Sequence, residues 1–504
     1  MRKDSVTYME TTIAEVQQSM LAGELTSTEL VSWYLERIGS LDKEGPSINS
    51  IVNLNSKALE EAGTLDHYLK TTGQLKGKLH GVPVLVKDQA ETAGIPTTFG
   101  SKAFHNYIPD QDATLITRLR EAGAVILAKT SMCDFAAGWF SFSSETQHTR
   151  NPYARERETG GSSAGTSAGI ASNFGLVGIG EDTGGSIRLP SSFNNLFGLR
   201  VTTGLISRAG FSPLVHFQDT PGPIGRTVRD TARLLDVIAG YDPEDSYTAA
   251  AVQSDEIGHY EEMLESAELH GKKIGILRQA FGPDSDPDCE PVNRKVSEAI
   301  ERLRSLGAEI VEDVTIPNLE EYLAETSLYS MQSKFDIDNF LSNRPNAPLR
   351  SFMEVYEANA FHELNDLFHD IAAGPDDPTT SLDYYRKRLA QEKFRHTILG
   401  VFAKHSLDTI VFPAVRVLPP TREDLASGKW TCLTFPTNTV IASQSILPSL
   451  SVPAGLTEDG IPVGFEMLGM PFREGKLLQL GYAYEQAMQP RQAPDLEVTL
   501  ISEQ

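Results

Sequence analysis

Short apolar runs alternate with helical patterns along most of the chain, and this alternation restricts the fold more than any other feature. Three runs have the length of strands that a sheet buries on both faces: Val82–Val86, Ala124–Ala128 and Leu176–Ile179. The helical patterns that separate or follow them are Thr114–Glu121, Gly165–Asn173 and Thr227–Ile238. Strands and helices in alternation indicate an α/β fold with helices on both faces of a central sheet.

The same alternation returns in the second half of the chain. A predicted helix over Val292–Leu306 lies between apolar runs at Lys273–Leu277 and Glu309–Val314. Further strand-like runs and a closing helix follow at Thr409–Phe412, Ser449–Val452, Val463–Met467 and Lys476–Gln486. We expect the late strands to complete the earlier sheet, so that residues 1–504 form a single domain.

That domain has four predicted parts. They are N-terminal helices (1–75), a core (76–250), a helix-rich region (251–410) and C-terminal strands (411–504). The second N-terminal helix opens at a capping box, Thr26-Ser-Thr-Glu29. The helical stretch 318–405 is interpreted either as a packed helical layer or as a cap over a substrate pocket.

Composition argues against several classes of function. The 504 residues carry a formal net charge of −24, which repels nucleic acid and anionic lipid, so we expect neither as a partner. The alternative explanation of this charge is that it serves only solubility. The three cysteines, Cys133, Cys289 and Cys432, are too far apart in sequence for a disulfide framework or a zinc site. The chain shows no signal peptide and no apolar run that could span a membrane, so we expect a cytoplasmic protein.

Two segments are dense in glycine and serine, and each leads into a helical pattern. They are Thr159-Gly-Gly-Ser-Ser-Ala-Gly-Thr-Ser-Ala-Gly169 and Gly180-Glu-Asp-Thr-Gly-Gly-Ser-Ile-Arg188. Glycine lets backbone N–H groups approach a ligand closely, and such groups at the start of a helix attract negative charge. A serine in that setting has donors for an oxyanion beside it.

Other interpretations of these segments are weaker. Glycine-serine stretches also form plain loops, and neither segment has the spacing of a phosphate-binding loop. Gly161-Ser-Ser-Ala-Gly165 and Gly165-Thr-Ser-Ala-Gly169 match Gly-x-Ser-x-Gly, the nucleophile elbow of α/β-hydrolases. An elbow follows a buried strand, whereas residues 151–158 are largely polar and charged, so this context argues against it.

Lys87 ends the apolar run of Gly81-Val-Pro-Val-Leu-Val-Lys-Asp88. Burial disfavours the charge of a lysine and lowers its pKa, and a neutral amine can accept a proton from a hydroxyl. A lysine that reaches solvent, or one that pairs with Asp88, is the alternative. Lys87 is therefore a candidate general base.

Taken together, these segments resemble the amidase signature family. The likeness is strong over Thr26 to Tyr241 and looser over Ser449 to Gln486. Its centre is formed by Gly160-Gly-Ser-Ser163 and Asp182-Thr-Gly-Gly-Ser-Ile-Arg188, preceded by Gly81-Val-Pro and Val-Lys-Asp88. The resemblance implies the fold of that family, a central mixed β-sheet covered by helices on both faces.

The resemblance also implies a Ser–cis-Ser–Lys triad. Ser186 corresponds to the nucleophile, Ser162 after a cis peptide bond to the bridging serine, and Lys87 to the base. The oxyanion hole corresponds to the backbone N–H groups of Thr183, Gly184, Gly185 and Ser186, and the supporting positions to Ser163, Asp182 and Arg188. This chemistry requires no metal and no organic cofactor.

The implied activity is hydrolysis of the carbon–nitrogen bond of small carboxamides, such as aryl, acyl or peptide amides, through an acyl-enzyme. Gln218-Asp-Thr-Pro-Gly-Pro-Ile224 resembles a stretch of the peptide amidase and broad-specificity amidase branch. Two alternatives stay open: an ester or carbamate hydrolase with the same triad, and a glutaminase subunit of a tRNA-dependent amidotransferase.

Met132 and Phe135 are candidate pocket walls, with core packing as their alternative. Family members are often dimers, so the resemblance allows a homodimer.

Overall fold

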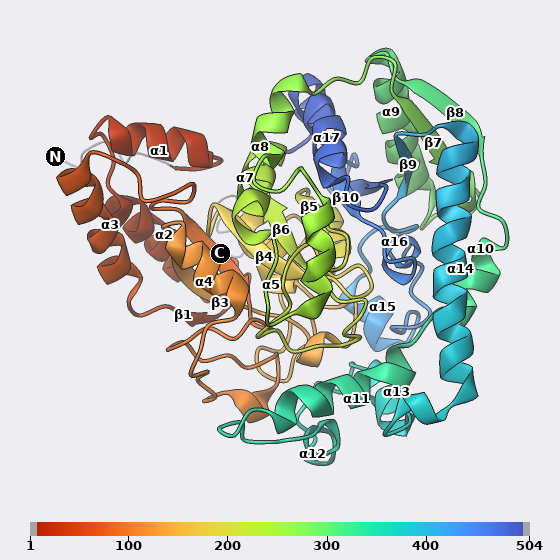
Figure 1. Ribbon diagram of the computed structural model, residues 1–504, viewed down its shortest axis with the longest axis horizontal. Helices are drawn as coiled ribbons and strands as arrows, with labels where there is room; N and C mark the ends of the chain where they lie inside the picture. The colour runs from red at the N-terminus through yellow and green to blue at the C-terminus, as the bar shows by residue number, and fades with distance from the viewer. Residues whose placement is uncertain (1–7, 497–504) are drawn as a thin grey trace.

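Among residues 8–496, which the computed structural model describes, eleven strands form one mixed sheet (Figure 1). Their order across the sheet is β1-β3-β2-β4-β6-β5-β10-β11-β9-β7-β8. In chain order the strands are β1 (Ile51–Leu54), β2 (Pro83–Lys87), β3 (Val125–Thr130), β4 (Val177–Glu181), β5 (Phe197–Arg200), β6 (Pro221–Gly225), β7 (Lys273–Leu277), β8 (Glu309–Val314), β9 (Thr409–Pro413), β10 (Ser449–Leu456) and β11 (Pro462–Leu468). The strands β3, β2 and β4 are parallel, as are β9, β7 and β8, and the pairs from β4 through β6, β5, β10 and β11 to β9 are antiparallel.

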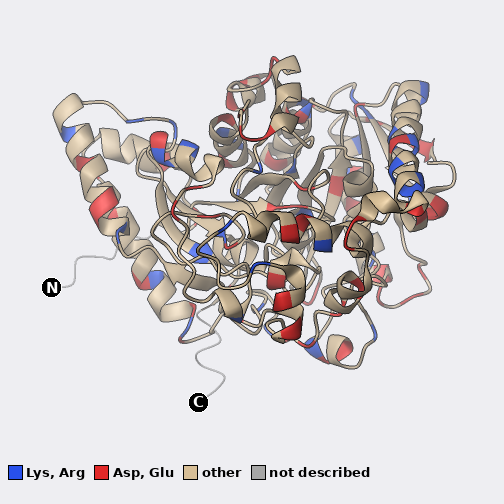
Figure 2. Cartoon of the chain, turned by 60° about the horizontal axis from the view of Figure 1, so that its bottom comes forward, with Lys and Arg blue, Asp and Glu red and all other residues tan. Residues whose placement is uncertain are grey.

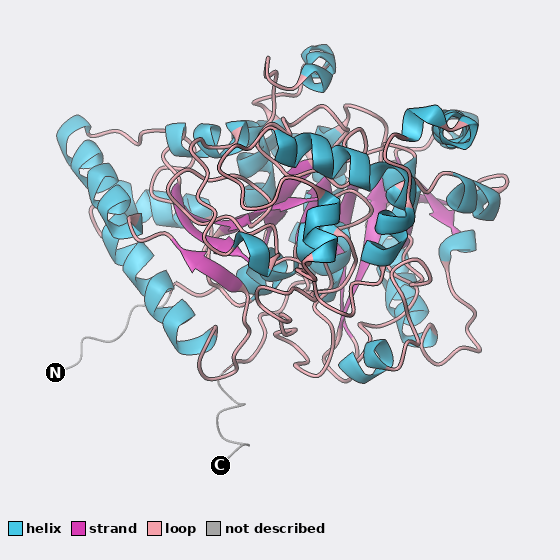
Figure 3. Cartoon of the chain, turned by 90° about the horizontal axis from the view of Figure 1, so that it is seen from below, coloured by secondary structure: helices cyan, strands magenta, loops and turns pink. Residues whose placement is uncertain are grey.

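Helices flank this sheet on both sides (Figure 3). They are α1 (Ile13–Leu21), α2 (Ser27–Leu41), α3 (Ala58–Thr72), α4 (Thr114–Glu121), α5 (Ala164–Ala171), α6 (Arg188–Phe193), α7 (Val228–Ile238), α8 (Tyr260–Met263), α9 (Glu290–Ser305), α10 (Leu319–Glu325), α11 (Tyr329–Ser342), α12 (Phe352–Glu357), α13 (Leu367–Ala373), α14 (Leu382–His405), α15 (Arg422–Ala426), α16 (Val440–Gln444) and α17 (Glu474–Met488). Helices α5 and α6 lie against the central strands, and α7, α9 and α17 also contact them. The mixed sheet with its helical layers confirms the predicted fold class.

The apolar runs explain the best-predicted elements. β2, β3 and β4 are buried at every residue, as expected of strands covered on both faces. Helix α4 and strands β7 and β8 have the bounds that the pattern predicted. The capping box is also confirmed: the Thr26 hydroxyl accepts from the N–H of Glu29, whose carboxylate accepts from the N–H of Thr26.

Three strands, β1, β5 and β6, were not predicted from the sequence, and the pattern of β6 argued against a strand. Its residues, Pro221-Gly-Pro-Ile-Gly225, look like a loop because proline lacks the N–H that a ladder needs. All five residues nevertheless pair with β4, whereas the ladder to β5 involves only Ile224 and Gly225. The two prolines lie outside that second ladder, so a central position is compatible with them.

The outer parts of the molecule are helical. Helices α1 to α3 form one flank, α11 to α13 lie together along the lower edge, and α14 runs along the opposite flank (Figure 1). Acidic and basic residues are interspersed along the helices of the chain (Figure 2). Of the helices within residues 8–496, none has the length and apolarity that crossing a bilayer requires. The single domain over residues 1–504 stays a prediction, which the continuity of the sheet supports.

Candidate active site

Two parallel neighbours of the sheet, β2 and β4, place Lys87 beside the second glycine-serine segment. Lys87 is the last residue of β2 and Glu181 the last of β4, so both side chains emerge at the same edge. The Lys87 side chain is fully buried. This arrangement excludes the solvent-exposed lysine that the sequence left open.

Lys87 contacts the first glycine-serine segment through Ser162. Its Nζ donates to the Ser162 Oγ at 2.7 Å, although 75 positions separate the two residues in the chain. The Gly161–Ser162 peptide bond is cis, as the family resemblance implied. The hydrogen bonds of the described residues include this link but none between the hydroxyls of Ser162 and Ser186.

Burial is the main influence on the amine. It lowers the pKa of Lys87, while the nearby carboxyl of Glu181 opposes that effect. Nζ also donates to the backbone oxygen of Glu181 at 3.1 Å. A lysine whose charge is disfavoured in this way is suited to accept a proton from the hydroxyl it contacts.

Ser186 lies in the loop between β4 and α6, and the loop's conformation depends on glycine. Gly185 has φ +132°, and a Cβ there would meet the Thr439 Oγ1 at 2.0 Å. The backbone oxygen of Gly184 accepts from the Thr439 Oγ1 at 2.8 Å and from the Trp139 Nε1 at 3.2 Å. These contacts hold the Gly184 carbonyl toward Thr439 and Trp139.

Not all of the predicted oxyanion donors are free. The N–H of Gly185 donates to the Asp182 Oδ1 at 2.9 Å, so the Asp182 carboxylate already occupies it. Within residues 8–496, the N–H groups of Thr183, Gly184 and Ser186 make no hydrogen bond to protein atoms. Three of the four predicted donors are thus open to a negatively charged oxygen.

Asp182 is the centre of a buried ionic network beneath this loop. It accepts from both Arg188 and Arg200, with Nη–Oδ1 distances of 3.1 and 2.9 Å, and from the N–H of Ile187. Burial alone would raise the pKa of Asp182, but the two guanidinium groups outweigh it and hold that pKa well below its usual range. Asp182 and Arg188 thereby join both sides of the Ser186 loop, and their supporting role stays a prediction.

Arg188 and Ser163 connect that loop to its surroundings. The Arg188 Nη1 donates to the Glu466 Oε2 of β11 at 2.6 Å, which links the first half of the chain to the late strands. The N–H of Ser163 donates to the backbone oxygen of Ser186 at 3.2 Å. The two glycine-serine segments are therefore held together directly, next to Lys87.

A narrow cavity opens at Ser186 and is almost entirely apolar. Its lining is formed by Ala136, Gly138, Trp139, Thr183, Gly184, Ser186, Leu214, Tyr329, Leu367 and Cys432. Tyr329 and Leu367 are the first residues of α11 and α13, so the helical stretch 318–405 supplies part of the wall. This placement favours the cap over the plain helical layer.

Met132 and Phe135 belong to the segment that borders this cavity, but neither is among its lining residues. Both are fully buried, and the Phe135 ring packs against Phe99 and Phe104 at centroid distances of 5.7 and 5.5 Å. In this structure they are core residues, the alternative that the sequence left open. Ala136, Gly138 and Trp139 form the wall in their place.

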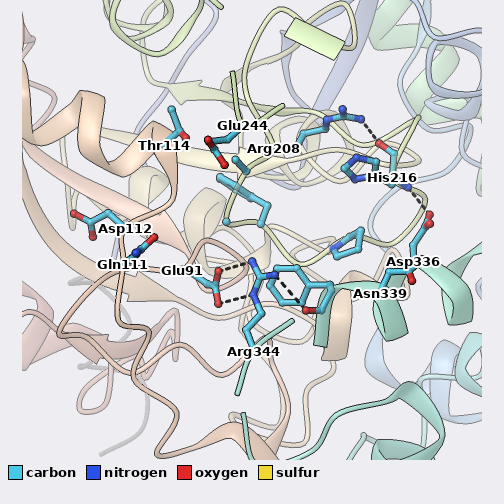
Figure 4. Close-up of a pocket in the computed structure, with 15 residues that line it drawn as sticks. Glu91, Gln111, Asp112, Thr114, Arg208, His216, Glu244, Asp336, Asn339 and Arg344 are labelled. Carbon is cyan, nitrogen blue, oxygen red and sulfur yellow. Dashed lines mark hydrogen bonds and ion pairs between the residues drawn. The ribbon is translucent and has the colours of Figure 1, made fainter. Parts of the chain in front are cut away.

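A second, larger cavity of about 520 Å³ lies on the other side of the segment Pro213–His216 (Figure 4). Leu214 faces the first cavity, whereas Pro213 and His216 line the second. Its walls are charged, and the Arg344 guanidinium pairs with the Glu91 carboxylate at 2.8 Å. The two cavities thus differ in polarity although they share one short piece of wall.

Several residues of the site carried no signal that sequence reasoning used. Arg200, Thr439 and Glu466 come from distant strands and helices, and only the fold brings them beneath the Ser186 loop. Glu181 could have been recognised as a candidate site residue. It is an acidic residue at the end of a buried strand, which is unusual, and the neighbouring strand ends in Lys87. Among the described residues, no group of histidine, cysteine and acidic side chains could hold a metal ion.

The family model described as Amidase matches residues 29–478. The chain belongs to the amidase family. Membership confirms the resemblance inferred from the glycine-serine segments, and it extends across nearly the whole chain.

Two kinds of relative within the amidase family are similar to this chain. Peptide amidase from Stenotrophomonas maltophilia superposes with a TM-score of 0.87 and 34% identity, covering 97% of this chain and 99% of its own. A subunit of the glutamyl-tRNA(Gln) amidotransferase from Rippkaea orientalis is 34% identical over 96% of this chain and 99% of its own length. The structure of the corresponding amidotransferase subunit from Thermotoga maritima superposes with a TM-score of 0.76 and 26% identity, covering 98% and 99%. Both kinds of enzyme act within one fold, so the family alone leaves the substrate open.

Proposed function

We propose that this protein is a serine amidase that hydrolyses small carboxamides with an uncharged, largely apolar acyl or aryl group. The observation that carries the proposal is the Lys87–Ser162 contact of 2.7 Å beside Ser186, on the wall of an apolar cavity. A base, a hydroxyl relay and a nucleophile are thereby gathered beside one apolar cavity.

The first step makes Ser186 a nucleophile. Neutral Lys87 accepts the proton of the Ser162 hydroxyl, and Ser162 accepts the proton of Ser186. The Ser186 oxygen then forms a bond to the amide carbon, and the carbonyl π electrons move to its oxygen. The open N–H groups of Thr183, Gly184 and Ser186 stabilise that oxyanion, and losing one such donor typically costs about 3–4 kcal/mol.

Collapse of the intermediate breaks the carbon–nitrogen bond. The proton held on Lys87 returns through Ser162 to the leaving nitrogen, which departs as an amine or ammonia and leaves an acyl-enzyme. Water then attacks the acyl carbon, with the same relay taking its proton and returning one to Ser186. The products are a carboxylate and an amine, and the enzyme ends in its starting state.

The cavity lining supports an apolar substrate over glutamine. Free glutamine carries an α-ammonium and an α-carboxylate, and burying either charge without a partner costs several kcal/mol, on the order of the desolvation penalties known for buried ions. None of the ten residues that line the cavity at Ser186 has a charged side chain. Apolar acyl and aryl groups meet no such penalty there.

A glutaminase subunit of an amidotransferase is the second candidate. The observation that favours it is the level of similarity to the amidotransferase relative, 34% identity over nearly the whole chain. In that case the chain would act with partner subunits, and tRNA would be a substrate of the assembly. An ester or carbamate hydrolase would use the same site with a different leaving group.

The test is a substrate panel with the purified full-length chain. The panel contains an aryl acylamide, a C-terminal peptide amide, an aliphatic amide, glutamine, and matched ester and carbamate analogues. Ser186→Ala serves as the inactive variant. Ser167→Ala is its matched control, because Ser167 is a buried serine of α5 whose hydroxyl has no hydrogen-bond partner among residues 8–496.

We expect turnover of the apolar amides by the wild type and Ser167→Ala, and none by Ser186→Ala. Glutamine as the preferred substrate would overturn the proposal in favour of the amidotransferase role. Turnover of esters or carbamates alone would keep the nucleophile and reject the amidase assignment.

A further inference from the structure

The amine of Lys87 lies between two groups, and the mechanism above uses only one of them. On one side Nζ contacts the Ser162 Oγ at 2.7 Å. On the other side it contacts the carboxylate oxygen Oε2 of Glu181 at 3.4 Å. Both side chains of this ion pair are buried, with 0% exposed for Lys87 and 1% for Glu181. Water therefore screens the pair very little.

The second carboxylate oxygen of Glu181 is held in place as well. Its Oε1 lies 3.3 Å from the Thr183 Oγ1, and the Thr183 hydroxyl donates to the Asp219 Oδ1 at 2.6 Å. Asp219 in turn accepts from the N–H groups of Leu214 and Val215. The carboxylate is thus oriented by the loop that also carries the oxyanion donors.

Few charges face this pair. Lys87 is influenced by Glu181, Cys133 and Asp182, and Glu181 by Asp219, Lys87 and Asp182. The charge of Asp182 is offset by Arg188 and Arg200, which leaves Asp219 as the uncompensated neighbour. Burial, and then Asp219, raise the pKa of Glu181 to about 8. Burial raises the pKa of the Cys133 thiol, so that group stays neutral near pH 7.

We propose that Glu181 is a positioning residue for Lys87, whose carboxylate acts as the counter-ion of the ammonium that forms when Lys87 takes the proton of Ser162. The inference rests on the proposed function, since it gives Lys87 the role of base. The proton balance is closed: the proton leaves Ser186 through Ser162, resides on Lys87 beside the Glu181 carboxylate, and passes back to the leaving amine. Glu181 itself forms and breaks no covalent bond with the substrate.

This role has two consequences for the rate. A carboxylate beside Lys87 makes the amine a stronger base, which favours removal of the Ser162 proton. It also moves deprotonation of the ammonium to higher pH, so the enzyme becomes active only in less acidic solution. The active form has both groups deprotonated, so protonation of either one on the acid side lowers the rate.

The experiment compares pH profiles of kcat/KM for wild type, Glu181→Gln and Glu181→Asp. Glu181→Gln keeps the size of the side chain and removes its charge, whereas Glu181→Asp keeps the charge on a shorter side chain. Glu474→Gln is the matched control, because Glu474 is a fully buried glutamate that accepts from the Thr202 N–H and is not among the groups that face Lys87. Thermal unfolding verifies that each variant is folded.

A second readout does not depend on amide turnover. A fluorophosphonate reagent labels an activated serine. Its rate of reaction with Ser186 measures how strongly the base activates that serine. The pH profile of labelling is recorded for the same four proteins. Labelling without amide turnover would reject the proposed function. The labelling profiles of the Glu181 variants would still test the role of Glu181 as counter-ion.

We expect Glu181→Gln to move the acid limb of both profiles to lower pH by about 1–3 units, the usual effect of an opposite charge at this range. The plateau rate should fall on the order of tenfold, because the base is weaker. Glu181→Asp should lie between this variant and the wild type, and Glu474→Gln should coincide with the wild type. A folded Glu181→Gln whose acid limb coincides with the wild type would overturn the inference, as would a wild type inert to both amides and reagent.

Discussion

Lys87 and Lys129 are two buried lysines on neighbouring strands, at the same edge of the sheet. Lys87 pairs in register with Thr130, the residue after Lys129, and both lysine side chains have an exposed fraction of 0%. Burial lowers the pKa of each, and a carboxylate lies near each, Glu181 in one case and Asp88 in the other. Residue type and burial therefore do not distinguish them. Strand position does, because Lys87 is in register with Thr130 and the side chain of Lys129 points to the opposite face of the sheet.

Their partners distinguish them as well. Lys129 donates to the Ala90 backbone oxygen at 2.6 Å and to the Thr97 Oγ1 at 2.8 Å, and it pairs with Asp88 at 3.2 Å. All three acceptors belong to one loop, which Lys129 holds against the sheet. Lys87 instead reaches a hydroxyl of a segment that also contacts Ser186. The difference shows that the role of a buried lysine depends on the groups to which it donates hydrogen bonds.

The largest expected effect is that of Lys87→Met. We expect kcat to fall by about 10²–10⁴-fold, since the proposed general base is lost. The free energy of unfolding should fall as well, because Glu181 loses its buried cation. Steady-state kinetics with the best amide substrate, together with thermal unfolding, measure the two quantities. Activity close to wild type would remove the distinction between the two lysines.

Lys129→Met should lower stability with little effect on catalysis. Asp88 would be left buried without its cation, and breaking one partner of such a pair typically lowers the free energy of unfolding by about 3–5 kcal/mol. The kcat of the folded enzyme should change far less than in Lys87→Met. Denaturant unfolding and kinetics below the transition separate these effects.

The double variant Lys129→Met with Asp88→Asn sharpens this prediction. It should recover part of the lost stability, because no unpaired charge remains. If the single variant were as stable as the wild type, Lys129 would have no structural role of this kind.

The pH dependence of the wild type gives a smaller but direct comparison. Below the pKa of Lys87 the amine is protonated and has no lone pair for the Ser162 proton, so kcat/KM should fall as pH decreases. Burial lowers that pKa, so the decrease should begin well below the pKa of about 10.4 of an ordinary lysine. A kcat/KM independent of pH throughout the acid range would contradict Lys87 as base.

The smallest effect is expected at the charged cavity of Figure 4, where Glu91 and Arg344 pair at 2.8 Å. Their side chains are 10% and 24% exposed, so water screens this pair more than the two lysine sites. We expect Glu91→Gln to lower the free energy of unfolding by no more than about 1 kcal/mol. A larger loss, measured by denaturant unfolding, would show that burial is not what separates the three ion pairs.

Much of the fold and part of the site could be predicted from sequence, for reasons visible in particular residues. Runs such as Val82–Val86 are long enough and apolar enough that only a buried strand accommodates them. The glycine-serine segments carried the family resemblance and with it Ser162, Ser186 and Lys87. β6 was missed because its two prolines usually mark a loop.

The amino-acid sequence by itself determined the family, most of the strands and helices, and the segments that hold the proposed nucleophile and base, because each of these depends on local composition or short-range pattern. Tertiary structure alone decided that Asp182 occupies the Gly185 N–H and that Met132 and Phe135 pack in the core. It also placed Glu181 beside Lys87 and kept charged side chains out of the cavity wall at Ser186. These outcomes depend on contacts between residues far apart in the chain, whose distances are set only when the sheet closes.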